Sequence, residues 1–155
     1  MSVADLMNSV GLTHGGFYKQ FESKEALVGE AIAEAFADLS EVLSEFDASS
    51  ENLGVARSSF IASYLSEDHQ ETPETGCPVA GFTADLGRGS YAVETQEIFA
   101  DGVQRMADWL SQGDTDEGFV TLSTLVGAIL MARATAGTEL SEKILAAARR
   151  SQSAE

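Results

Sequence analysis

The chain has 155 residues, of which 44% are hydrophobic, a size and composition that fit one packed domain, or a small domain with an appendage, and exclude a disordered tail. Lys and Arg number 9 against 25 Asp and Glu, so the formal net charge is −16. Because so acidic a surface repels nucleic acid and anionic membranes, any contact with DNA must come from a local segment that is not negative.

Targeting signals and disulfides are not predicted. The N-terminus lacks a basic start followed by an apolar run, so no signal peptide is expected. The stretch of residues 118 to 132 has no charged side chain, but it is shorter than the roughly 20 residues that cross a bilayer. A lone cysteine excludes an internal disulfide, and we expect a cytoplasmic protein.

Two short helices are predicted at the start of the chain, over residues 2 to 10 and 13 to 21. Ser2 begins a pattern that resembles a capping box, and Thr13 is a good N-cap for the second helix. Gly11 stands where a helix ends with a left-handed residue.

A long third helix is predicted over residues 23 to 46, with Ser23 at its start. Apolar side chains three or four residues apart form one continuous stripe along it: Val28, Ile32, Phe36, Leu39, Leu43 and Phe46. Acidic side chains repeat with the same spacing on another face, which we interpret as solvated surface. The stripe predicts that this helix packs lengthwise against the rest of the protein.

The rest of the chain also reads as helix, interrupted by glycine and proline, so the predicted fold class is all-α. The predicted helices cover residues 53 to 66, 78 to 86, 90 to 112, 117 to 136 and 139 to 150. Residues 67 to 77 are interpreted as a loop. The helix over residues 117 to 136 is apolar nearly all round, so the core or a second chain must cover it, and we expect a homodimer through the last two helices.

Two short helices joined by a glycine turn make a helix-turn-helix, whose second helix can enter the major groove of DNA. We expect five apolar side chains to hold the two helices at an angle: Leu6, Val10, Leu12, Phe17 and Phe21. Up to residue 24 there are two basic and two acidic side chains, so this segment is neutral within a strongly acidic chain. Its charge permits contact with phosphates.

Residues 2 to 28 resemble the DNA-binding segment of the TetR family of transcriptional regulators. The resemblance is carried by Ser-Val-Ala-Asp-Leu at 2 to 6, Val-Gly-Leu-Thr-His-Gly-Gly-Phe-Tyr-Lys-Gln-Phe at 10 to 21 and Ser-Lys-Glu-Ala-Leu at 23 to 27. The remaining chain is similar to that family in helix order and length, and in Gly76-Cys77-Pro78. Family members carry one further helix before this motif, and without it we expect weak DNA binding.

The resemblance implies a dimeric, ligand-responsive regulator, most often a repressor, that binds a near-palindromic operator and needs no cofactor. It places seven residues at the DNA: Thr13, His14, Gly15, Gly16, Tyr18, Lys19 and Lys24. Thr13, Tyr18 and Lys24 would meet phosphates, and His14 and Lys19 would discriminate base sequence. The two glycines would let the backbone approach the bases closely.

The chain is predicted to consist of two functional parts. Residues 1 to 46 form the DNA-binding segment with its connecting helix, and residues 47 to 155 form a ligand-binding and dimerisation domain. The alternative is a dimeric small-molecule-binding or protein-interaction module that has lost DNA binding. No phosphate-binding glycine loop, metalloprotease pair or nucleophile elbow occurs, so an enzyme is not expected.

Candidate ligand-binding residues are large side chains of the second part: Phe60, Tyr64, Phe99, Met106 and Trp109. Aromatic residues at helical spacing can equally be plain core. Cys77 lies close to a helix N-terminus, which favours a thiolate and a redox-sensitive role, and the alternative is an inert, half-buried cysteine. The two histidines are far apart in the sequence, so no metal site is predicted.

Overall fold

The computed structural model describes residues 2–111 and 113–153, with all their side chains except those of His14 and Thr115. This part of the chain consists of helices and turns without a strand, which confirms the all-α class. The helices are α1 (Val3–Ser9), α2 (His14–Gln20), α3 (Lys24–Ser49), α4 (Leu53–Tyr64), α5 (Glu67–Glu71), the 3-10 helix η1 (Pro73–Thr75), α6 (Pro78–Arg88), α7 (Val93–Leu110), α8 (Thr115–Ala134) and α9 (Glu139–Gln152).

The predicted caps of the first three helices are confirmed. The side chains of Ser2, Thr13 and Ser23 each accept a hydrogen bond from a backbone N–H three residues later. Each cap satisfies one of the N–H groups that a helix leaves unpaired at its start. Gly11 has a φ of 71°, the left-handed conformation predicted for the turn between α1 and α2.

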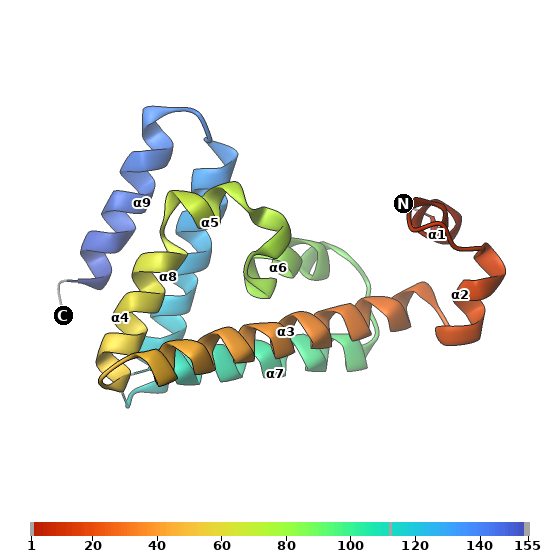
Figure 1. Ribbon diagram of the computed structural model, residues 1–155, viewed down its shortest axis with the longest axis horizontal. Helices are drawn as coiled ribbons and strands as arrows, with labels where there is room; N and C mark the ends of the chain where they lie inside the picture. The colour runs from red at the N-terminus through yellow and green to blue at the C-terminus, as the bar shows by residue number, and fades with distance from the viewer. Residues whose placement is uncertain (1, 112, 154–155) are drawn as a thin grey trace.

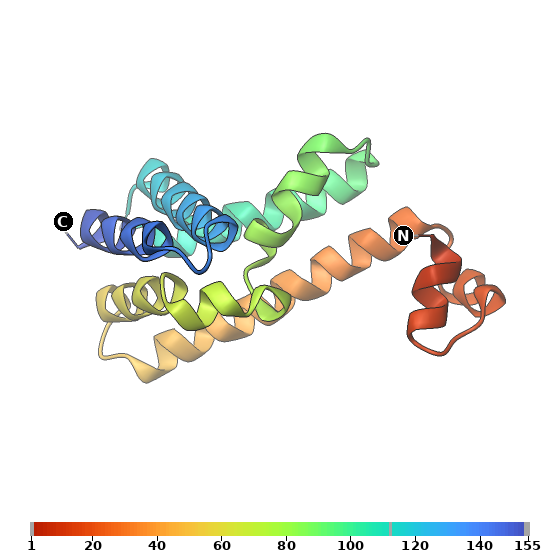
Figure 2. The same ribbon diagram turned by 90° about the horizontal axis from the view of Figure 1, so that it is seen from above.

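Helix α3 is the longest element and connects the two ends of the molecule (Figure 1). The α1–α2 pair lies at its start, and α4, α8 and α9 gather around its other end (Figures 1 and 2). Helix α7 runs beside α3 in the same direction. The Glu25 carboxylate accepts a hydrogen bond from the Ala92 N–H at the start of this pair, and the Trp109 indole donates to Asp47 at its end, over 3.0 Å.

Helix α8 provides the centre of the core. Leu125, Ile129 and Ala132 on α8 are fully buried, and α8 packs against both α7 and α9. By length and composition its stretch Asp116–Ala134 could cross a membrane, and 44% of that stretch is buried inside the protein. The apolar content of α8 therefore serves first to hold the bundle together.

Glycine permits two close approaches along α7. A Cβ atom built on Gly118 of α8 would lie 2.1 Å from the Ala107 carbonyl oxygen of α7. A Cβ atom built on Gly102 of α7 would lie 2.4 Å from the ring of Phe36 on α3. Real Cβ atoms do not come this close to other heavy atoms, so α8 and α3 reach α7 only because these positions lack a side chain.

The prediction that residues 67 to 77 form a loop is wrong, because this segment contains α5 and η1. The Ser66 hydroxyl accepts the His69 N–H over 3.2 Å and so caps α5. Two acidic residues in the first turn of α5 add a favourable interaction with the helix dipole. This short folded segment forms one wall of the cavity described below.

Candidate functional site

The helix-turn-helix at the N-terminus is a compact pair built around one aromatic ring. Phe17 on α2 is almost fully buried and packs against the rings of Tyr18 and Phe21, with centroid distances of 5.1 and 5.3 Å. Met7 on α1 is also buried, and its side chain lies next to Gly16 of α2. Phe17 and Met7 therefore hold the two helices together.

Two residues predicted to hold this pair together are exposed instead. Val10 is 61% exposed and Leu12 is 56% exposed, because both lie in the turn that leads from α1 to α2. Met7, which was not among the predicted residues, is buried instead. Leu6 and Phe21 are partly buried, as expected for the edge of so small a cluster.

The residues predicted to contact DNA lie on or next to α2. Thr13, Gly15, Tyr18, Lys19 and Lys24 are exposed, and Gly16 is partly exposed. The Thr13 side-chain oxygen accepts the Gly16 N–H over 3.2 Å, so this hydroxyl has a capping role within the protein itself. The side chain of His14 lies outside the described residues. The arrangement leaves an exposed polar face along the second helix of the motif.

One carboxylate next to this motif, that of Asp5, is held in its charged form. The Ser2 side chain and backbone N–H both donate hydrogen bonds to Asp5, and these lower the pKa of its exposed carboxyl group. Asp5 thus remains an anion, and its carboxylate completes the capping box of α1 with Ser2. The two lysines, Lys19 and Lys24, balance this charge and that of Glu22 in the segment.

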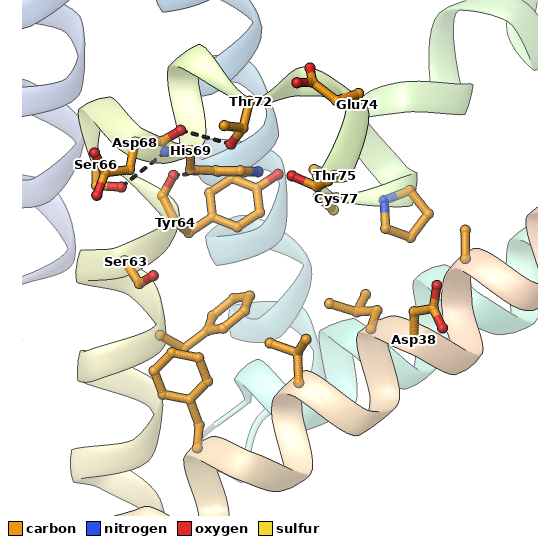
Figure 3. A pocket seen from close by; sticks show the side chains of 17 residues that line it. Asp38, Ser63, Tyr64, Ser66, Asp68, His69, Thr72, Glu74, Thr75 and Cys77 are labelled. Carbon is orange, nitrogen blue, oxygen red and sulfur yellow. Dashed lines mark hydrogen bonds between the residues drawn. The ribbon is translucent and has the colours of Figure 1, made fainter.

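A cavity of about 590 Å³ lies between α3, α4, α5, η1 and the start of α6 (Figure 3). This volume is in the range of small-molecule sites. Its apolar wall consists of Leu39, Val42 and Phe46 from α3 together with Phe60 from α4. The Phe46 and Phe60 rings pack edge to face with centroids 5.5 Å apart, which keeps this wall firm.

The opposite wall is polar and comes from α4, α5 and η1 (Figure 3). The His69 ring packs on the Tyr64 ring at a centroid distance of 4.4 Å, and its Nδ1 lies 2.7 Å from the Tyr64 carbonyl oxygen. Because a carbonyl oxygen only accepts, this nitrogen carries a proton and donates. Burial lowers the pKa of His69, so its ring is neutral at pH 7.

Cys77 lies at the end of this wall and is only 7% exposed. Its thiol points toward the Met106 sulfur at 3.9 Å, and burial raises its pKa. Desolvation therefore favours the alternative interpretation, an inert buried cysteine, over a thiolate at this helix N-terminus. The chemistry of this position is that of a small, buried, protonated thiol.

The structure separates the five candidate ligand-binding residues. Phe60 and Tyr64 line the cavity, whereas Phe99, Met106 and Trp109 do not. Phe99 packs on Phe36 at a centroid distance of 5.8 Å, Met106 is buried in the core, and Trp109 packs behind Phe60 at 5.3 Å. These three side chains therefore support the cavity from within the core.

Most of the polar lining was not predicted from the sequence, including Asp38, Asp68, His69, Glu74 and Thr75. The apolar stripe on α3 gave a signal only for the apolar wall of the cavity. A serine followed by two acidic residues at 66 to 68 was the available signal for a helix cap. Within the described residues, no group of three or more His, Cys, Asp and Glu side chains is placed to hold a metal ion.

We expect the lowered pKa of His69 to make the stability of the protein depend on pH. The folded state favours the neutral ring, so this contribution is complete above the unfolded pKa of about 6.5 and is lost as the pH falls below it. Urea unfolding at pH 7.5 and pH 5.5 measures the loss. The control, His69→Asn, keeps a donor for the Tyr64 carbonyl but does not titrate, so its loss should be smaller. An equal loss in both proteins would contradict the prediction.

Sequence comparison shows that the chain is similar to a known protein. No protein-family model matches the chain. The HTH-type transcriptional repressor DhaR of Mycobacterium sp. (strain GP1) is 27% identical to it over 114 residues. The match covers 72% of this chain and 56% of DhaR, so the chain spans just over half the length of that relative. The chain is therefore similar to part of a helix-turn-helix transcriptional repressor.

Proposed function

We propose that the protein is a TetR-like, ligand-responsive transcriptional repressor that acts in the cytoplasm and binds a near-palindromic operator as a homodimer. The observation that carries the proposal is the exposed polar face of α2 within a capped helix-turn-helix. The similarity to a helix-turn-helix repressor supports it independently.

In this proposal, α2 enters the major groove and positions the protein through phosphate contacts. Thr13, Tyr18 and Lys24 contact phosphates, while His14 and Lys19 contact base edges. Gly15 and Gly16 lie in the first turn of α2, where the N-terminal N–H groups favour a phosphate. The local charge is neutral, so few counterions are released, and we expect DNA affinity to depend weakly on salt.

The effector binds in the cavity between α3, α4 and α5. Three successive turns of α3 contribute Leu39, Val42 and Phe46 to its wall, and the same helix begins at Ser23 directly after the DNA-binding motif. A ligand that favours one orientation of α3 therefore also favours one position of α2.

The homodimer forms through the outer faces of α8 and α9. Several apolar side chains remain exposed there, among them Val120 at 65%, Met131 at 54% and Leu140 at 53%. Exposing this apolar surface to water is unfavourable for a monomer. A partner chain would cover the surface on the last two helices.

We expect Val120→Glu to shift the protein from dimer to monomer, because a carboxylate in an apolar interface loses its hydration without gaining a partner. Sedimentation velocity at micromolar concentration measures the change. Val93→Glu is the matched control, since Val93 is 63% exposed on α7, outside the proposed interface. A wild-type protein that sediments as a 16.4 kDa species would contradict the proposed dimer.

The experiment that tests DNA recognition is selection from a pool of random duplexes, followed by mobility-shift titration of the enriched sequence. The proposal expects two inverted half-sites about one helical turn apart, because each protomer inserts one α2 helix. Enrichment of no common sequence would contradict it. That outcome would favour the second candidate, a dimeric binding module, which the exposed apolar face of α8 also supports.

A further inference from the structure

One polar atom of the cavity is buried with only a thiol beside it. Tyr64 is only 4% exposed, and among the described residues its hydroxyl has no nitrogen or oxygen partner, only the side chain of Cys77. The hydroxyl points toward η1 and the start of α6, where Thr75 and Cys77 lie (Figure 3). Burial and the interaction with the Cys77 side chain raise the pKa of Tyr64, so the hydroxyl keeps its proton. Sulfur is only a weak acceptor, so this buried donor is poorly satisfied, and an oxygen acceptor on a bound ligand would form a stronger hydrogen bond.

The charge of the lining selects against anions. Asp38, Asp68 and Glu74 lie on the rim of the cavity, and no Lys or Arg is among the lining residues. The nearest guanidinium, that of Arg133 on α8, donates to the carbonyl oxygens of His69 and Gln70 over 2.7 and 3.3 Å. These two hydrogen bonds anchor α5, and Arg133 itself is not among the residues that line the cavity. A carboxylate or phosphate group would meet like charge here.

The rest of the ligand must be apolar, because Leu39, Val42, Phe46 and Phe60 form a continuous wall facing the polar one. Aromatic rings next to an open apolar volume favour an aryl or alkyl group. The Tyr64 ring itself is held in place by the His69 ring and by Phe60, at centroid distances of 4.4 and 5.7 Å. The position of its hydroxyl is therefore fixed before a ligand arrives.

We infer that the cavity binds an apolar molecule without negative charge that carries one hydrogen-bond acceptor, such as a ketone, ether or ester, and that the Tyr64 hydroxyl donates to this acceptor. The inference rests on the proposed function in one respect, namely that this cavity is the effector site. The Tyr64 hydroxyl raises the affinity for ligands that have an acceptor at their buried end. The acidic side chains of the rim lower the affinity for anions by electrostatic repulsion.

The test is isothermal titration calorimetry of the whole chain with three probes of similar size: butyrophenone, butylbenzene and phenylbutyrate. The ketone offers an acceptor, the hydrocarbon offers none, and the third probe is an anion. We expect Tyr64→Phe to weaken butyrophenone binding about threefold to tenfold, the effect of one hydrogen bond. The affinity for butylbenzene should change less than twofold, and phenylbutyrate should bind the wild-type protein more weakly than butyrophenone.

The matched control is Tyr91→Phe, which removes a hydroxyl outside the cavity and should leave all three affinities unchanged. The inference is overturned if Tyr64→Phe leaves butyrophenone binding within twofold of wild type. It is also overturned if phenylbutyrate binds as tightly as the ketone, or if no probe binds. DNA binding is measured separately by mobility shift, so a protein that binds its selected duplex but none of the probes refutes this inference alone. Binding of the ketone as predicted, without any DNA binding, refutes the repressor alone.

Discussion

Gly118→Ala is expected to lower the free energy of unfolding by about 2 kcal/mol or more, although alanine is the better helix former. The added Cβ atom would lie 2.1 Å from the Ala107 carbonyl oxygen, a backbone atom that cannot rotate away. Helices α7 and α8 must then separate, and their separation disturbs the packing of buried residues such as Met106 and Leu122. Urea unfolding followed by circular dichroism measures the change.

Gly127→Ala on the same helix is the matched control. A Cβ atom on Gly127 meets no atom within 4 Å, so this variant gains helix propensity without a clash. We expect it to be as stable as wild type or more stable by up to about 1 kcal/mol. If both alanine variants had the same stability, the close approach of α7 and α8 would be refuted.

Gly15→Glu is expected to weaken DNA binding on the order of a hundredfold while leaving the protein folded. A Cβ atom on Gly15 meets nothing within 4 Å, and an acidic residue in the first turn of α2 suits the helix dipole. On DNA, however, the new carboxylate would lie against phosphates and would block the approach of the backbone, and such like-charge contacts cost several kcal/mol. Mobility-shift titration with the selected duplex, at fixed salt, measures the loss.

The matched control is Gly81→Glu, which makes the same change of net charge at an exposed position of α6 where a Cβ atom also meets nothing. This variant should bind DNA within about threefold of wild type, because it adds one charge far from α2. An equal loss in both variants would mean that net charge alone governs the affinity. Wild-type affinity in Gly15→Glu would mean that α2 does not face the DNA.

Helix positions could be predicted from the sequence because the signals are local. Ser2, Thr13 and Ser23 cap helices through hydrogen bonds to residues only three positions away. The stripe on α3 was also sufficient, since Ile32 and Phe36 are buried as predicted. These features depend on the neighbouring sequence and not on how the helices are assembled.

The cavity could not be predicted, because its walls come from segments between residues 35 and 78 that meet only in the folded protein. Phe60 and Phe99 have the same character in the sequence, yet only Phe60 reaches the cavity. The helical periodicity of α8 was equally ambiguous. Leu125 is buried in the monomer and Val120 is exposed on its surface. Which of these side chains is buried depends on where α7 and α9 pack against α8.

The contact between the Phe36 ring of α3 and Gly102 of α7 is a point about which α3 could tilt. Helix α3 extends about 18 Å from Phe36 back to Lys24, at 1.5 Å per residue. A tilt of about 10° around this contact would displace the start of α3, and α2 with it, by about 3 Å. Leu39, Val42 and Phe46 lie on the other arm, where a molecule in the cavity would push. In the proposed mechanism α3 would act as a lever, and such a tilt would move α2 by a distance comparable to the rise of one base pair.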